Sequence, residues 1–140
     1  MDFTGKYACT LWYGIEYAFQ GKELFFDMEI EETDNFFTGI AIDIDGVGVS
    51  PDEAKVVGII NGIHIEFDKI YKRRHYTDGN GETIFEENEG FPIYYEGTYN
   101  DETGYYEGSW KYKVLRRFLF FFTKPVSIGS GTFRLKKIEI

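Results

Sequence analysis

Residues 23–31 read Glu23-Leu24-Phe25-Phe26-Asp27-Met28-Glu29-Ile30-Glu31, and this stretch decides the fold class. Its even-numbered positions from 24 to 30 are apolar, and its odd-numbered positions are mostly acidic. A period of two is typical of a β-strand with one buried and one solvated face. The stretch therefore predicts a strand of an antiparallel sheet, because such sheets commonly leave one face in water.

Similar alternation recurs in later segments. At 36–44 the even-numbered positions are mostly apolar, which predicts that Ile40 and Ile42 face inward, and at 63–71 the odd-numbered positions are predicted to do so. Asn-Gly and Asp-Gly dipeptides lie between several of these segments, as they do in β-hairpins. Further strands are expected at 6–17, 56–60, 82–86, 93–99, 105–114 and 132–138.

The composition favours an all-β fold. Ile, Val, Thr and aromatic residues account for 58 of 140 residues, whereas Ala, Leu and Met account for 11. Branched and aromatic side chains fit a pleated sheet, and Ala, Leu and Met favour helices. Short sequential connections favour up-and-down order, and closure removes the exposed edges of a sheet. We predict one domain, residues 1–140, folded as an antiparallel up-and-down closed β-barrel of about eight to ten strands, with a β-sandwich as the alternative.

Charge and length exclude several classes of protein. The 24 acidic and 15 basic side chains give a net charge of −9, which on average repels a nucleic-acid backbone. No stretch approaches the roughly 20 apolar residues of a membrane helix. Cys9 is the only cysteine, and residues 1–6 lack the basic and apolar pattern of a signal peptide. We expect a cytoplasmic protein without an internal disulfide that neither binds nucleic acid nor spans a membrane.

Gly5-Lys6-Tyr7 opens the first expected strand of the chain. This motif resembles the start of the calycin superfamily of lipocalin-like and avidin-like barrels, which typically carry Gly-x-Trp at this place. Gly108-Ser109-Trp110 and the closing Gly131-Thr132-Phe133-Arg134-Leu135 are similar to small bacterial lipocalin-like domains of unassigned function. The resemblance spans most of the chain and implies a lipocalin-like barrel in which Arg134 packs over the first-strand aromatic residue. The chain departs from the pattern in having Tyr7 in place of tryptophan and in lacking the Thr-Asp-Tyr of true lipocalins.

The interior of the predicted barrel is the first candidate site. Eight strands enclose room for packed side chains or for one small ligand. Phenol groups among apolar walls would hold an apolar or amphipathic molecule and orient its polar end by hydrogen bonds. The alternative is a barrel filled by its own aromatic rings, and the sequence leaves both open. The candidate ligand-binding residues are Tyr13, Phe67, Tyr95, Tyr99, Tyr106, Trp110 and Tyr112.

Basic residues gather in two segments, at 69–75 and 116–124. If these strand ends meet at one rim, they form a cationic mouth that attracts the anionic end of a ligand. The alternative is a solvated hairpin tip beside acidic loops. The candidate rim cations are Lys72, Arg73, Arg74, Arg116 and Arg117.

The segment Phe118-Leu119-Phe120-Phe121-Phe122 breaks the alternation. In a half-exposed strand every second ring would face water, which a monomer usually avoids. We therefore predict that a dimer partner, a lipid-like ligand or the protein's own N-terminus covers this run, and that Phe25 and Phe37 on outward positions extend it. The second functional hypothesis is an interaction module with a filled barrel that forms a homodimer through Phe118, Phe120 and Phe122.

No set of residues predicts catalysis, a cofactor or a bound metal. His64 and His75 are expected on different faces of the sheet, and no serine lies in a nucleophile motif. Asp43-Ile44-Asp45-Gly46 matches only the first part of a calcium-loop pattern, so Asp43 is expected to be a solvated strand residue. We therefore expect a protein that is not an enzyme.

Overall fold

The structure is a computed structural model that describes residues 2–77, 82–118 and 122–138; for residues 77, 113–118 and 122–128 it describes the backbone alone. None of the described residues forms a helix long and apolar enough to cross a membrane. The strands are β1 (Gly5–Tyr13), β2 (Glu23–Thr33), β3 (Phe36–Gly46), β4 (Ala54–Asn61), β5 (His64–Tyr71), β6 (His75–Thr77), β7 (Thr83–Phe85), β8 (Ile93–Asn100), β9 (Tyr105–Phe118) and β10 (Phe122–Lys137).

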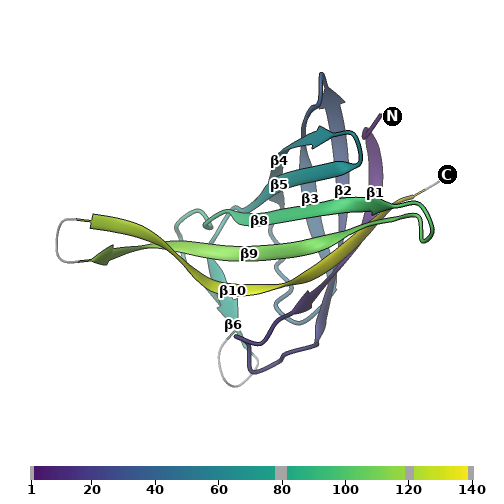
Figure 1. Cartoon of the computed structure of the whole chain (residues 1–140). Coiled ribbons are helices and arrows are strands. Elements are labelled where there is room, and N and C mark those ends of the chain that lie inside the picture. Colours follow the sequence, from purple (N-terminus) through teal and green to yellow (C-terminus); the bar gives the residue numbers. More distant parts are fainter. Residues whose placement is uncertain (1, 78–81, 119–121, 139–140) are drawn as a thin grey trace.

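Eight of these strands close into an antiparallel barrel in the order β1-β10-β9-β8-β5-β4-β3-β2. The chain visits the barrel strands in sequence, and β10 finally pairs with β1 to close the ring (Figure 1). β6 and β7 form a separate two-stranded sheet, inserted between β5 and β8. The predicted all-β, antiparallel, up-and-down closed barrel is therefore confirmed.

In β2 and β5, the side chains at the alternating positions predicted to face inward are the ones that are buried. In β2 the positions from Leu24 to Ile30 are buried at even numbers, and in β5 the positions from Ile65 to Tyr71 are buried at odd numbers. β1 ends at Tyr13, well before the expected end at residue 17, because turns occupy most of the following segment. Closure then directs one set of alternating side chains from every barrel strand into the same interior.

The predicted facing of β3 is wrong. Phe37 and Asp43 are buried, whereas Ile40 and Ile42 are exposed on the outer face of the barrel. Phe37 therefore does not extend an outer patch with Phe25, which is indeed exposed. Asp43 is not a solvated strand residue but lies inside the barrel.

The register between β2 and β3 explains this inversion. Asp34 and Asn35 have φ angles of 52° and 70°, which suit the tight two-residue turn that joins the strands. With this turn fixed, Phe26 lies directly opposite Asp43. Residues directly opposite in an antiparallel pair point to the same face, so the inward side of β2 determines the inward side of β3.

Aromatic rings fill one end of the barrel. The ring centroid of Phe3 lies 4.6 Å from that of Tyr7 and 4.7 Å from that of Phe37. A third ring, Tyr106, lies 5.4 Å from Phe3 in an edge-on arrangement. The backbone N–H of Phe3 donates to Oε1 of Glu32 at 2.7 Å, which holds the N-terminal segment across this end. The half of the barrel beside Phe3 is thus a packed core.

A pair of glycines allows close packing between β8 and β9. Gly97 and Gly108 lie directly opposite each other in the two strands. A Cβ atom on Gly108 would clash with the carbonyl oxygen of Glu96 and lie 2.6 Å from the Cα atom of Gly97. A Cβ atom on Gly97 would lie 2.9 Å from the ring of the buried Phe133. Because neither Gly97 nor Gly108 has a side chain, the backbones of β8 and β9 can pack closely and the ring of Phe133 fits against them.

We expect Gly108→Ala to destabilise the barrel, because the added methyl group meets backbone atoms that cannot turn aside. The expected loss in the free energy of unfolding is about 1–3 kcal/mol, measured by urea denaturation. Ser109→Ala is the matched control, since Ser109 is exposed on the same strand, and it should change the stability by less than about 0.5 kcal/mol. Equal stability of the two variants would show that the strands have room at Gly108.

Candidate ligand-binding cavity

The end of the barrel opposite Phe3 contains a cavity of about 510 Å³. This volume lies within the range of small-molecule sites in proteins, and its lining is mostly apolar and aromatic. The barrel is therefore filled in one half and hollow in the other, which combines the two alternatives that the sequence leaves open. The lining includes Leu11, Tyr13, Tyr17, Phe19, Leu24, Lys69, Tyr71, Arg74, His75, Phe91, Ile93, Tyr95, Trp110 and Tyr112.

Four of the seven residues predicted to bind a ligand line this cavity, namely Tyr13, Tyr95, Trp110 and Tyr112. The Trp110 indole N–H donates to the Trp12 carbonyl oxygen at 3.2 Å, and the Tyr13 hydroxyl donates to the Val47 carbonyl oxygen at 2.5 Å. These bonds fix two of the wall rings, which lie edge to face with centroids 5.8 Å apart. The wall therefore has a defined shape before any ligand binds.

The other three predicted residues belong to the packed half. Phe67 stacks on Tyr95 with a centroid distance of 4.6 Å and an angle of 5° between the ring planes. Tyr99 and Tyr106 pack against each other at 5.1 Å beside the closed end. Their inward facing is as predicted, but they contribute to the core beneath the cavity rather than to its wall.

Lys69 lies at the inner end of the cavity and is fully buried. Its ammonium Nζ lies 3.8 Å from the ring centroid of Phe26, 5.0 Å from that of Tyr71 and 5.3 Å from that of Tyr95. Burial lowers the pKa of this amine to about 8, and the negative charge of Asp43 only partly offsets the effect. Cation–π contacts thus replace the hydration of the amine in its charged form.

Two polar atoms at this inner end lack hydrogen-bond partners. Within the described part of the chain, neither Nζ of Lys69 nor the hydroxyl of Tyr95 has one, and both atoms are buried. Burial also raises the pKa of Tyr95 well above its ordinary value, so the phenol stays protonated and remains a donor. Leaving a buried polar group unpaired costs roughly 1–3 kcal/mol, which a suitable acceptor would recover.

The interior also contains the buried carboxylate of Asp43. The Tyr71 hydroxyl lies 2.8 Å from both of its oxygens, and the backbone N–H of Ser50 donates to Oδ2 at 3.0 Å. These donors satisfy the carboxylate, and burial together with the nearby negative charge raises the pKa of Tyr71. Among the residues whose side chains are described, the buried charged groups are thus Lys69 and the hydrogen-bonded Asp43.

The mouth of the cavity carries fewer free cations than the sequence predicts. Arg73 and Arg74 line it, but Arg73 donates twice to Asp52, at 2.6 and 3.0 Å. Arg74 donates to the backbone carbonyl of Glu89 at 2.9 Å, so no carboxylate neutralises its charge through this bond. Lys72 is exposed and does not contribute to the lining, and the side chains of Arg116 and Arg117 lie outside the described residues.

His75 and Cys9 show how the interior affects other titratable groups. The His75 ring lies at the mouth, 3.2 Å from the Gly48 carbonyl oxygen, and burial lowers its pKa. Burial raises the pKa of the Cys9 thiol, which keeps it protonated and poorly nucleophilic. The lowered pKa values of Lys69 and His75 thus increase their neutral forms at neutral pH, whereas the raised pKa of Cys9 decreases its thiolate form.

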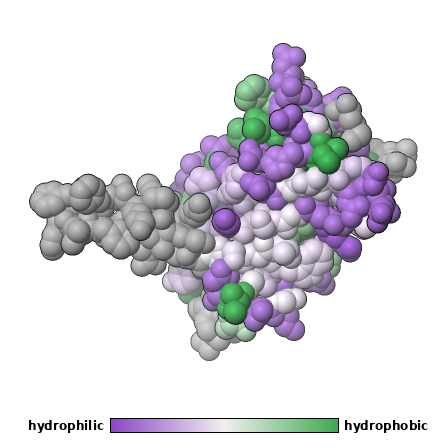
Figure 2. All heavy atoms as spheres, in the orientation of Figure 1, coloured by the Kyte–Doolittle hydropathy of each residue, from purple (hydrophilic) through white to green (hydrophobic). Residues whose placement is uncertain are grey.

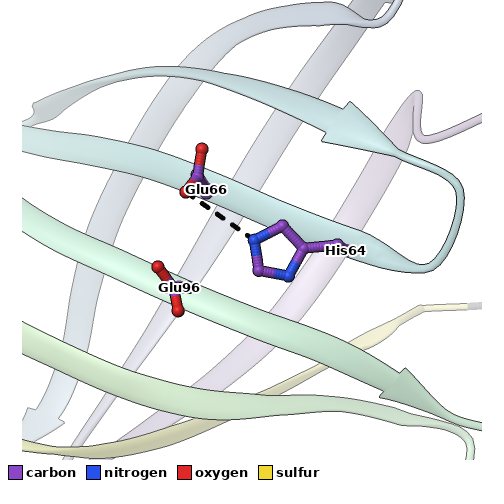
Figure 3. Close-up of side chains that lie close together, drawn as sticks. All are labelled: His64, Glu66 and Glu96. Atoms are coloured by element: carbon purple, nitrogen blue, oxygen red, sulfur yellow. Dashed lines mark ion pairs between the residues drawn. The ribbon is translucent and has the colours of Figure 1, made fainter.

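The outer wall holds a polar cluster made of His64, Glu66 and Glu96, with ligand atoms within 4.8 Å of one another (Figure 3). Nε2 of His64 lies 3.7 Å from a Glu66 oxygen. The Tyr94 hydroxyl lies 2.8 Å from Glu66 and 2.9 Å from Glu96, so it bridges the two carboxylates. These side chains lie on the solvated outer face and form a polar surface network.

Exposed apolar side chains occur where the sequence does not predict them. They gather on the outer face of β3 and β4, and hydrophobic surface is visible around the β4–β5 hairpin in Figure 2. The predicted Phe-rich interface falls elsewhere: Phe120 lies outside the described residues, and for Phe118 and Phe122 only the backbone is described. The large apolar residues exposed on β3 and β4 are Phe36, Ile40, Ile42, Ile44, Val57 and Ile59.

The sequence predicts only part of the polar interior of the barrel. The odd-numbered positions of 63–71, Lys69 among them, are predicted to face inward, but the charge of Lys69 is counted with the basic residues of the rim, and Asp43 is expected on the solvated face. The signal for Lys69 was present, because it shares the odd-numbered positions of β5 with Ile65 and Phe67. The signal for Asp43 was absent from β3 itself and came from the register with β2.

No family model matches the chain, and no curated protein or solved structure matches it either. The closed eight-stranded barrel is compatible with the calycin-like fold that the short motifs imply. Arg134 departs from the expected packing, because its guanidinium lies 4.5 Å from the Tyr105 ring and 5.5 Å from the Trp12 ring, whereas Tyr7 is buried inside. The geometry thus establishes the barrel and its cavity.

Lys69→Met tests the burial of the amine. Burial lowers the pKa of Lys69 in the folded protein to about 8, whereas a lysine in the unfolded chain has a pKa of about 10.4. At a pH between these two values, unfolding therefore takes up a proton. As the pH rises from 8 to about 10.4, the free energy of unfolding of the unsubstituted protein should increase by about 2 kcal/mol relative to that of Lys69→Met. Urea denaturation at a series of pH values measures this difference.

Lys111→Met is the matched control, because Lys111 is exposed on the outer face of β9. Its stability difference from the unsubstituted protein should show no comparable trend over the same pH range. A flat difference for Lys69→Met as well would mean that the Lys69 amine is hydrated in the folded protein.

Proposed function

We propose that this protein binds a small amphipathic molecule inside the barrel, with the hydrogen-bond-accepting end of the molecule toward Lys69 and Tyr95. The observation that carries the proposal is an apolar cavity of about 510 Å³ with two unpartnered donors at its inner end. An apolar body would gain from burial against the rings, and an acceptor would pair with donors that already lie in a water-poor environment.

The shape of the interior supports one orientation. The aromatic wall provides apolar contacts along the cavity, whereas Lys69 and Tyr95 lie at its closed end. A ligand that enters with its polar group first would therefore place this group at Lys69 and Tyr95 and its apolar part against the aromatic wall. Arg74 at the mouth offers a second contact for a ligand that also carries an anionic group.

The resemblance to lipocalin-like barrels adds support of a weaker kind, since fold alone does not define function. The alternative from the sequence, a self-associating module with a filled barrel, depends on Phe118, Phe120 and Phe122 and stays a prediction. The cavity favours ligand binding over this alternative.

Decan-1-ol is a suitable test ligand, because it combines an apolar chain with one small polar group and cannot react with an amine. We expect it to bind the purified protein at one molecule per chain, measured by native mass spectrometry and isothermal titration calorimetry. Ile93→Trp should weaken this binding about tenfold or more, because Ile93 lines the cavity and a larger ring would occupy it.

Thr98→Trp is the matched control, because Thr98 is exposed and belongs to the same strand, β8. It adds an equal ring outside the barrel and should leave the affinity unchanged. The proposal is wrong if decan-1-ol does not bind, or if Ile93→Trp binds it as tightly as Thr98→Trp does.

A further inference from the structure

We infer that the ligand is an aldehyde and that Lys69 binds it covalently as an imine, an inference that rests on the proposed binding function. The carbonyl group is the acceptor that the inner end of the cavity would receive. The inference depends on the geometry around Nζ, on the charge of the interior and on the exposure of the other lysines.

The surroundings of Lys69 favour an amine that can react. Its Nζ lies against the rings of Phe26, Tyr71 and Tyr95 and has no hydrogen-bond acceptor among the described residues. Since burial lowers the pKa to about 8, about a fifth of the molecules carry the neutral amine near pH 7.4, against about one in a thousand for an ordinary lysine. Imine formation needs this neutral form.

The reaction balances without an oxidant or reductant. The lone pair of Nζ attacks the carbonyl carbon, and a proton passes from nitrogen to oxygen to give a carbinolamine. Loss of the hydroxyl group with one further proton, as water, then forms the carbon–nitrogen double bond. The Tyr95 hydroxyl, a buried donor without a partner, is placed at the same end of the cavity to donate to the carbonyl oxygen.

The charge of the interior favours a neutral carbonyl over a carboxylate. Asp43 already places a buried carboxylate in the barrel, close enough for its charge to offset part of the lowering of the Lys69 pKa that burial causes. A second carboxylate at Lys69 would be repelled by it, whereas an aldehyde carries no charge. Once the imine has formed, the same Asp43 charge would stabilise its protonated state.

Burial also determines the rates. Lys69 and Tyr95 both have 0% exposed surface, so an aldehyde reaches Nζ only when a ring at the cavity floor turns aside. The same rings would then exclude water and slow hydrolysis of the imine. The other lysines whose side chains are described are exposed, so imines formed there would hydrolyse freely.

Reductive trapping with decanal tests the inference. The protein is incubated with decanal, then reduced with sodium cyanoborohydride, and peptide mapping by mass spectrometry locates the decyl group. We expect one adduct per chain on Lys69, formed at least about tenfold faster than on any exposed lysine. The rate at Lys69 should rise with pH and level off above about 8, whereas rates at exposed lysines should keep rising.

Lys69→Arg and Lys69→Met should both lose the fast adduct, and Lys111→Arg, which removes an exposed lysine, should keep it. Circular dichroism checks that each variant is folded. Labelling confined to exposed lysines, in a protein that still binds decan-1-ol, would overturn the imine and leave the binding function intact. Failure to bind decan-1-ol as well would instead overturn the proposed function.

Discussion

Closure of eight antiparallel strands is the constraint on which the rest of this structure depends. Once the strands form a ring, alternate side chains of every strand must share one interior, whatever their chemistry. Lys69 follows from this rule, because Ile65 and Phe67 face inward on the same strand, four and two residues earlier. Asp43 follows from it too, through its pairing with Phe26. The polar groups of the cavity are thus consequences of register as much as of local sequence.

The interior is divided by the sizes of the side chains that enter it. Phe3, Phe37 and Tyr106 fill one end, and the stacked rings of Phe67 and Tyr95 continue this core to the middle of the barrel. Beyond that level the rings of the wall leave a cavity, and Lys69 lies where the packed half meets the hollow half. A buried amine placed there contacts aromatic faces on one side and the site of a ligand on the other.

The sequence predicts the fold well because alternation is strong in most strands. Strand β2 alone shows it over nine residues, and the turn at Asp34 and Asn35 is a recognisable hairpin sequence. The facing of β3 could not be predicted from β3 itself, since its outer positions carry Ile40 and Ile42, which look like core residues. Only the pairing with β2 corrects it. Likewise, the two halves of the barrel differ through three-dimensional packing that no single strand reveals.

The central claim is that Lys69 is a buried, unpaired amine at the inner end of an open cavity. An NMR pH titration of isotope-labelled lysine Cε signals tests it most directly, with and without decan-1-ol. We predict one lysine signal with a midpoint at a pH of about 8, absent from Lys69→Met and displaced when decan-1-ol binds. Titration of every lysine near about 10.4, with no signal responding to decan-1-ol, would contradict the claim.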